Sequence, residues 1–409
     1  MDLLQIKGKY DIQIVKLRDI ADKVTQKNSA YLVSETFTNS AEKGIISQED
    51  YFERTITNDK NISGYYIVNP DDFVYNPRVS TLAPVGPINR NKLGRTGVIS
   101  PLYLVFRVHN VEPGYLEWYF KSNAWHNFML ENGNTGARSD RFSISDTEFF
   151  SMPIPLPPMD VQKIIANTLD TLEIKINYAK VEAEKLRNFK SSMLTKMFPK
   201  EGEKVPEIRF EGFTGDWEQR KLGDIGIAKS GVGFPDVEQG GSKGTPFFKV
   251  SDMNTDGNEN ELVIANNYVT DEQISRKRWN VVTDVPAIFF AKVGAAVMLN
   301  RKRLVRFPFL LDNNTMAYIF DKEVWDCDFG KTLFETIDLT KLTQLGALPS
   351  YNSSDVEEIE IYIPLKVEQK CIGSYFKQLD NLITLHQRKY EKLLDVKKGL
   401  LRKLIGGAN

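Results

Sequence analysis

The sequence predicts an α+β protein with two mixed, strand-rich domains separated by two long helices that form an antiparallel coiled coil within the chain. Two observations predict this fold class: a repeat with a period of 207 residues, and heptad-spaced apolar residues inside each copy of the repeat. A third is the alternation of short β-branched or aromatic runs with turn residues ahead of each copy. The repeat implies two halves related by approximate two-fold symmetry.

Length and composition are those of an ordinary globular protein of two or three domains. The chain has 409 residues, of which 41% are hydrophobic and 26% charged. No run approaches 18 apolar residues and the first residues lack the layout of a secretory signal, so we expect a cytoplasmic protein without membrane association. The net charge of −1 means that any nucleic-acid surface must come from local clustering of cations.

The repeat divides the chain in the order domain, helix, domain, helix. Residues 162–198 reappear as 369–405, and a proline-marked strand-like stretch precedes each copy, at 152–156 and 361–365. Far upstream, the sequence KLRDI at 16–20 is echoed by KLGDI at 221–225. We expect the following boundaries: a first domain at 1–153, a first long helix within 154–200, a linker at 201–216, a second domain at 217–362 and a second long helix within 363–409.

The repeated segments carry a heptad seam in which apolar residues alternate steps of four and three. The seam positions are Ile165, Leu169, Leu172, Ile176 and Leu186 in the first helix, and Ile372, Phe376, Leu379, Ile383, Tyr390, Leu393 and Leu400 in the second. Small Ala179 and Ala183 in one helix correspond to bulky His386 and Tyr390 in the other, which favours pairing within the chain over homodimerisation. A helix that spans the 37 residues of 162–198 is about 55 Å long.

Basic residues cluster in each domain. Residues 76–107 contain five cations and no acid, and residues 273–311 contain eight cations and one acid. Cations can hold phosphates while asparagine amides can read base edges, and the duplication of the cluster favours duplex DNA over a merely solvated surface. The DNA-contact candidates are Arg78, Asn89, Arg90, Lys92 and Arg95 in the first domain, and Arg276, Lys277, Arg278, Lys292, Asn300, Arg301, Lys302 and Arg303 in the second.

Two loops at matching places add further candidates. Each follows a predicted helix, at 116–120 in the first half and at 330–335 in the second. The candidates are Arg138, Ser139 and Arg141 in the first loop, and Ser350, Tyr351 and Asn352 in the second. We expect Trp118, Trp125 and Trp325 to belong to the cores rather than to stack on bases.

Catalytic and metal-binding patterns are incomplete. The sequence Gly330-Lys331-Thr332 resembles the end of a phosphate-binding loop, but Trp325 stands where that loop needs its first glycine. No nuclease or methyltransferase motif is complete, and Cys327 and Cys371 are isolated, so we expect both cysteines to be buried and no metal or cofactor to be held by this chain. These patterns predict a non-catalytic protein.

The layout resembles the specificity subunit of type I restriction-modification enzymes over essentially the whole chain. The residues that carry the resemblance are the junction PEIRFEGFTGDWE at 206–218, which leads into KLGDI, and the closing sequence LLRKL at 400–404. The first domain begins with KGKYDI at 7–12 instead of a full copy of the junction.

The resemblance implies that each globular domain is a target-recognition domain that reads one half of a bipartite, asymmetric DNA site, while the helices set the spacer. It also implies partners: double-stranded DNA, two modification subunits that use S-adenosylmethionine to methylate adenine, and two restriction subunits that need ATP and Mg²⁺. Three alternatives remain: the specificity part of another methyltransferase–nuclease system, a fused modification–cleavage enzyme, and a structural coiled-coil adaptor.

Overall fold

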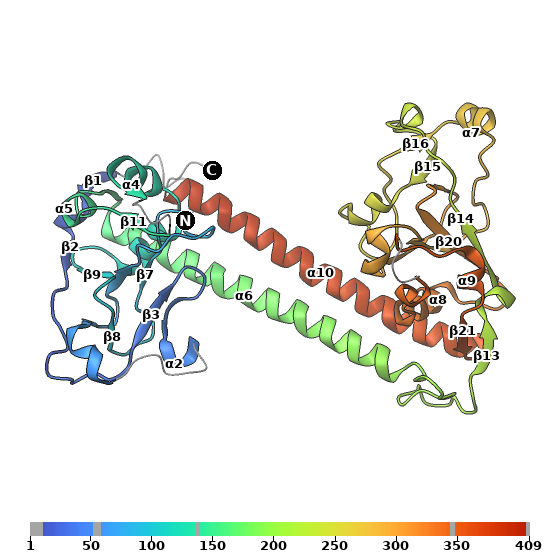
Figure 1. Cartoon of the computed structure of the whole chain (residues 1–409), viewed down its shortest axis with the longest axis horizontal. Helices are drawn as coiled ribbons and strands as arrows, with labels where there is room; N and C mark the ends of the chain where they lie inside the picture. The colour runs from blue at the N-terminus through green and yellow to red at the C-terminus, as the bar shows by residue number, and fades with distance from the viewer. Residues whose placement is uncertain (1–10, 52–58, 136–139, 344–347, 406–409) are drawn as a thin grey trace. The chain divides into compact units, whose positions relative to one another are not determined.

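The computed structural model describes residues 11–51, 59–135, 140–343 and 348–405 (Figure 1). The chain divides into two compact units, which we call unit 1 (Met1–Tyr178 with Tyr390–Asn409) and unit 2 (Ala179–Lys389). Each unit contains one globular domain together with a part of each long helix. The two halves of the predicted repeat are therefore described one after the other.

Unit 1 is built on short strands and short helices. Its strands are β1 (Gln13–Lys16), β2 (Ala21–Lys23), β3 (Phe37–Ser40), β4 (Gly44–Ser47), β5 (Tyr66–Val68), β6 (Phe73–Tyr75), β7 (Ile88–Arg90), β8 (Gly97–Ile99), β9 (Leu104–Val108), β10 (Asn134–Thr135), β11 (Phe142–Ser143) and β12 (Pro153–Leu156). Its short helices are α2 (Gln48–Tyr51), α3 (Pro113–Lys121), α4 (His126–Asn132) and α5 (Asp146–Phe149). The main sheet has the antiparallel order β2-β9-β6-β7.

Unit 2 repeats this plan. Its strands are β13 (Glu218–Lys221), β14 (Gly226–Ser230), β15 (Thr245–Phe248), β16 (Tyr268–Val269), β17 (Ala287–Ala291), β18 (Lys302–Val305), β19 (Leu310–Leu311), β20 (Thr315–Phe320) and β21 (Glu360–Ile363), and its short helices are α7 (Asp271–Lys277), α8 (Cys327–Thr336) and α9 (Ser353–Glu357). The main sheet, β14-β20-β17-β18, has the same order along the chain as β2-β9-β6-β7. The predicted strand-rich domains and the predicted helices at α3 and α8 are confirmed.

The entry to each long helix is built in the same way in both units. Strand β1 pairs antiparallel with β12, and β13 pairs antiparallel with β21. Immediately after β1 the Leu17 N–H donates to the Met152 carbonyl at 2.8 Å, and after β13 the Leu222 N–H donates to the Ile359 carbonyl at 3.0 Å. The echoed KLRDI and KLGDI segments therefore occupy equivalent places, which confirms the internal repeat.

The long helices are α6 (Met159–Lys196) and α10 (Lys366–Leu404) (Figure 1). Each begins three residues before the repeated segment that predicted it. In unit 1, Leu169 of α6 shares a core with Ile405 and the partly buried Leu400 and Leu404. In unit 2, Met197 just after α6 shares a core with Phe376 of α10. In each unit the beginning of one helix packs against the end of the other. The helices therefore pair antiparallel in each unit, as predicted.

The seam is most deeply buried where it enters a domain core. Its buried members are Ile165, Leu169, Leu172, Ile176, Ile372, Phe376 and Leu379, and its half-buried members are Leu186, Ile383, Tyr390, Leu393 and Leu400. The predicted core tryptophans Trp118, Trp125 and Trp325 are buried as well. The expectation that both cysteines are buried is wrong, because Cys371 is exposed and Cys327 is half-buried. Cys371 precedes the inward-facing Ile372, and one residue along a helix turns a side chain by about 100°.

A buried glutamine joins each domain to its long helix. The Gln162 Oε1 accepts from the Glu112 N–H at 2.9 Å, and the Gln369 Oε1 accepts from the Asp326 N–H at 2.9 Å. Glu112 and Asp326 are the N-caps of α3 and α8, so the same bond holds the start of a domain helix in both units. Helices also approach closely here, since a Cβ at Gly373 would lie 2.5 Å from the Phe329 backbone nitrogen.

Candidate nucleic-acid interface

Three of the arginines in the first basic stretch are neutralised inside unit 1. Arg95 makes a bidentate pair with Glu35, with Nε–Oε2 at 2.8 Å and Nη2–Oε1 at 2.7 Å. Arg107 pairs with buried Asp72 at 2.7 Å. Arg90 is only 13% exposed, and its Nη2 lies 2.7 Å from Glu117. These guanidinium charges serve the fold, because each already faces a carboxylate.

Glu117 on α3 is the centre of the largest of these clusters. It is buried, and Lys121, Arg90 and Lys92 lie 2.7, 2.7 and 3.4 Å from its oxygens. Burial alone would raise the pKa of the Glu117 carboxyl, but the charges of Lys121, Arg90 and Lys92 outweigh burial and hold that pKa below its ordinary value. Lys92 remains half exposed above this cluster. Its DNA-contact role stays a prediction.

Asn89 is also used by the fold. Its Nδ2 donates to the Asn39 Oδ1 at 2.7 Å and to the Ser40 carbonyl at 3.2 Å. An amide that already donates both of its protons to the protein has fewer bonds to offer a base edge.

Arg78 and Arg141 differ from the other arginines of this region. They face each other across an isolated antiparallel bridge, and both are exposed. Within the ranges that the structure describes, neither guanidinium has an ion-pair or hydrogen-bond partner. Arg138 and Ser139 lie outside the described residues. Of the predicted contacts of unit 1, Arg78 and Arg141 are thus the cations best placed to meet a phosphate.

The Arg78–Arg141 bridge lies between two open pockets. Arg141 lines a pocket of about 340 Å³ together with Lys23, Tyr66 and Tyr103. Arg78 lines a second pocket of about 360 Å³, which shares Tyr103 with the first. Cations beside half-buried tyrosines at the edge of open pockets are compatible with a surface that holds a nucleic-acid backbone next to its bases.

In unit 2 two adjacent cations of the basic stretch, Lys302 and Arg303, are bound within the fold. Lys302 is 7% exposed, and its Nζ donates to the Ile337 carbonyl at 2.5 Å and to the Asn300 Oδ1 at 2.8 Å. Burial lowers the pKa of the Lys302 ammonium to about 8. Arg303 donates to the Asn258 and Lys302 carbonyls at 2.6 and 2.9 Å, and burial also lowers its pKa. Lys302 and Arg303 therefore link β18 to the segments that contain Ile337 and Asn258.

Four other predicted contacts of this stretch are exposed: Arg276, Lys277, Arg278 and Arg301. Arg276 and Lys277 both pair with Glu238, at 2.7 and 3.4 Å, whereas Arg278 ends α7 in a left-handed conformation and is exposed. Arg301 is exposed and donates to the neutral amide oxygen of Asn254, which leaves its charge uncompensated by that contact. Arg278 and Arg301 are therefore better placed for phosphate than Lys302 or Arg303.

The predicted loop of unit 2, which contains Ser350, Tyr351 and Asn352, lies at the place that Arg141 occupies in unit 1. Val293 bridges Ser350 as Arg78 bridges Arg141, and the Tyr351 N–H donates to the Lys292 carbonyl as the Phe142 N–H donates to the Pro77 carbonyl. Both segments follow the equivalent strands β6 and β17. We call this feature, defined by residues 76–78 with 141–143 in unit 1 and by residues 292–293 with 350–352 in unit 2, the strand-end surface.

The strand-end surfaces share a backbone but differ in their side chains. Ser350 and Asn352 are exposed in unit 2, and Lys292 is half-buried. Tyr351 is buried, and its hydroxyl donates to the Ala291 carbonyl at 2.6 Å, so this ring belongs to the core; burial also raises its pKa. Asn352 caps α9 by accepting from the Asp355 N–H at 3.1 Å. Unit 1 therefore presents Arg78 and Arg141 where unit 2 presents Val293 and Ser350.

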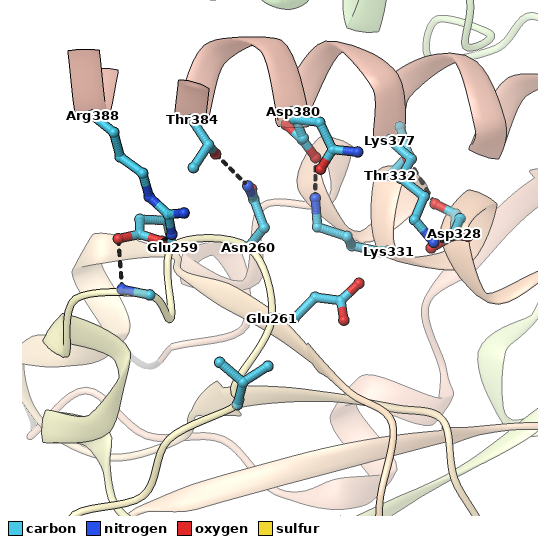
Figure 2. Close-up of a pocket in the computed structure, with 13 residues that line it drawn as sticks. Glu259, Asn260, Glu261, Asp328, Lys331, Thr332, Lys377, Asp380, Thr384 and Arg388 are labelled. Carbon is cyan, nitrogen blue, oxygen red and sulfur yellow. Dashed lines mark hydrogen bonds and ion pairs between the residues drawn. The ribbon is translucent and has the colours of Figure 1, made fainter. Parts of the chain in front are cut away.

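The phosphate-loop-like sequence Gly330-Lys331-Thr332 lies inside α8 and not in a loop. The Lys331 Nζ is held by Asp380 and by Glu335, and Figure 2 shows the Lys331–Asp380 pair at the edge of a pocket of about 270 Å³. Burial alone would lower the pKa of Lys331, but Glu335 and Asp380 outweigh burial and raise it. A lysine committed to two carboxylates is not available to a nucleotide phosphate.

One contact that ties the linker to α10 was not apparent from the sequence. Arg209 makes a bidentate pair with Glu368, with both N–O distances at 2.7 Å, and donates to the Gly215 carbonyl at 2.6 Å. Glu368 is 1% exposed. The junction at 206–218 includes Arg209, but the sequence does not show that Arg209 pairs with a carboxylate 159 positions away.

Across the four described ranges, no three His, Cys, Asp or Glu side chains are grouped so that they could hold a metal ion. None of the helices in those ranges is long and apolar enough to cross a membrane.

Comparison with known proteins identifies the family. The family model of the type I restriction modification DNA specificity domain matches residues 9–187 and 214–395. A putative type I restriction enzyme MjaX specificity subunit from Methanocaldococcus jannaschii is 22% identical over 415 residues, which cover 98% of this chain and 88% of the relative. The MjaVIII specificity subunit of the same organism is 23% identical over 284 residues, 63% of this chain and 62% of the relative.

A solved structure shares the fold. The crystal structure of the type I restriction-modification S subunit from M. genitalium matches with a TM-score of 0.64 and 13% identity, over 98% of each chain. The two family matches fall on the two halves of the internal repeat, one match to each half. The chain therefore belongs to the type I restriction-modification DNA specificity family, as a specificity subunit with two copies of the specificity domain.

Proposed function

We propose that this chain reads DNA for a type I restriction-modification complex without catalysing a reaction itself. Residues 1–153 and 217–362 are the two target-recognition domains, and each binds one half of a bipartite, asymmetric site. The observation that carries the proposal is the strand-end surface, which has the same backbone pairing in both units but different side chains. One scaffold with two sets of side chains suits two different half-sites.

The long helices are proposed to set the spacer between the half-sites. A helix of 38 residues is about 57 Å long, which is between one and a half and two turns of B-form DNA. Two modest half-site contacts joined by a stiff connection act as one bivalent binder, because the second contact becomes intramolecular only when the spacing is right. The unread spacer therefore contributes to specificity through its length.

The helices also offer equivalent surfaces for two copies of a partner. Tyr178 and Phe189 on α6 are exposed, and so are Leu385 and Val396 at the equivalent positions of α10. Exposed apolar side chains on a helix are typical of protein-binding surfaces. We propose that two modification subunits bind here and bring two restriction subunits with them, in the cytoplasm, where the DNA is. S-adenosylmethionine, ATP and Mg²⁺ would then be bound by the partners.

The test is methylome sequencing of cells that express this chain together with its modification subunit. We expect adenine methylation in both halves of one bipartite motif with a constant gap. A matched variant that lacks one heptad from each long helix should keep both half-sites and change the gap. A single continuous motif, or a gap that the deletion leaves unchanged, would contradict the proposal. A coiled-coil adaptor would produce no sequence-dependent methylation.

A further inference from the structure

We infer that two lysines at equivalent positions, Lys190 on α6 and Lys397 on α10, fix the register of the helix pair and so act as positioning residues for the DNA spacer. The inference rests on the proposed function, since it concerns the distance that the helices impose. It assigns that distance to particular ion pairs in addition to the apolar seam.

The two lysines make reciprocal contacts. The Lys190 Nζ lies 2.6 Å from the Asp380 Oδ1 in unit 2, and the Lys397 Nζ lies 2.6 Å from the Glu173 Oε2 in unit 1. Lys397 and Asp380 each follow their counterparts, Lys190 and Glu173, by the period of the repeat. The residue numbers in both pairs add up to the same total, as one antiparallel register requires. Each helix thus contributes the lysine to one pair and the acid to the other.

Both lysines occupy the heptad seam and are largely shielded from water. Lys190 is 13% exposed and contacts Glu335 at 2.5 Å in addition to Asp380. Asp380 also holds Lys331, as Figure 2 shows, so two lysines and two acids form one closed cluster of charges. The Lys397 Nζ lies 5.2 Å from the centre of the Trp118 ring, which covers it in unit 1.

Apolar packing marks the register mainly at the two ends of the seam, where Met197 meets Phe376 and Leu169 meets Ile405 in the domain cores. Along the half-buried middle of the seam, a slide of one helix by a heptad, about 10 Å, brings apolar positions opposite apolar positions again. The same slide carries each lysine away from its acid and leaves a charge within the seam, which is strongly unfavourable. A polar residue at a single core position is known to specify register in this way at some cost in stability.

The experiment compares spacer discrimination in the reconstituted complex of the full chain with its modification subunit. Substrates carry both half-sites with the native gap or with a gap changed by about three base pairs, which is the length of one heptad along DNA. The first variant combines Lys190→Met and Lys397→Met, and the control is Lys398→Met, at the exposed neighbouring position. Methionine keeps the seam packed but leaves Asp380 with Lys331 alone and Glu173 without Lys397, so we expect a lower melting temperature and measure it beside the methylation ratio.

We expect the ratio of methylation rates on native and altered gaps to fall about tenfold in the double variant and to stay unchanged in the control. A second test uses charge exchange. Glu173→Lys and Lys397→Glu should each reduce the ratio, and their combination should restore it, because the exchanged pair again marks one register. This rescue separates positioning from a general loss of stability.

The outcomes are distinct. If the methionine variant keeps the wild-type ratio, or if it melts lower with an unchanged ratio, the lysines contribute only to folding and the inference is wrong. If charge exchange does not restore the ratio, the Lys397–Glu173 pair does not mark the register. If the wild-type complex itself does not discriminate between gaps, the proposed function fails, and this inference fails with it.

Discussion

Replacing Arg78 and Arg141 by alanine should weaken DNA binding in a way that depends on salt. Both guanidinium groups are exposed on the strand-end surface of unit 1 and have no partner within the described ranges. Each phosphate contact that is lost lowers the slope of log affinity against log salt by about 0.9, so the loss of two lowers it by up to about 1.8. Between about 50 and 200 mM salt, the wild type should then lose about twelvefold more affinity than the double variant.

The assay is fluorescence anisotropy of the complex with a labelled duplex that carries its site, over a salt series. The matched control is Arg95→Ala, because Arg95 is also half exposed but already pairs with Glu35. We expect a wild-type slope in the control. An unchanged slope in the Arg78/Arg141 variant, or an equal flattening in the control, would refute the reasoning that ion pairing decides which cations reach phosphate.

Three further predictions concern stability. The pKa of Lys302 in the folded chain is about 8, below its ordinary value of 10.5, so the unfolded state binds more protons between these two pH values. The free energy of unfolding should therefore rise with pH across this window, by up to about 3 kcal/mol. Lys302→Met should remove this rise when urea unfolding is measured as a function of pH. Gly373→Ala should lower the melting temperature because its Cβ would meet the backbone of Phe329, whereas Gly399→Ala, with open space around it, should raise stability by about 0.5–1 kcal/mol. Arg209→Ala should cost roughly 2–3 kcal/mol in the same assay, since it leaves the Glu368 carboxylate buried without its partner; an unchanged unfolding midpoint would show that water replaces the guanidinium.

Features that repeat at short range were predicted correctly. The heptad steps from Ile165 to Ile176 and from Ile372 to Ile383 predicted both long helices, because a helix brings residues three and four apart onto one face. The echoed KLRDI and KLGDI segments predicted an internal repeat, and in the structure each begins at the last residue of an equivalent strand, β1 or β13, and continues as a short 3-10 helix. The exposed Cys371 shows the limit, since composition alone did not reveal which side of the helix it occupies.

The candidate site was only partly predictable. The sequence indicated the loops that contain Arg141 and Ser350, and the structure gives both the same backbone pairing. It did not indicate which cations are neutralised, because the acids lie far away in the sequence. Arg90 meets its carboxylate 27 positions away and Arg95 meets its own 60 positions away. A charge count over a short window cannot detect such partners.

The sequence by itself determined the repeat, the paired long helices and the strand-rich domains, because periodicity and turn chemistry act between neighbours in the chain. Only the tertiary structure decided what each charged residue does. Lys302 and Arg303 are adjacent to Arg301 in the sequence, yet they are bound to backbone oxygens inside unit 2 while Arg301 remains exposed. Whether a cation is available to DNA depends on its burial and on its nearest acid, and both are properties of the folded chain.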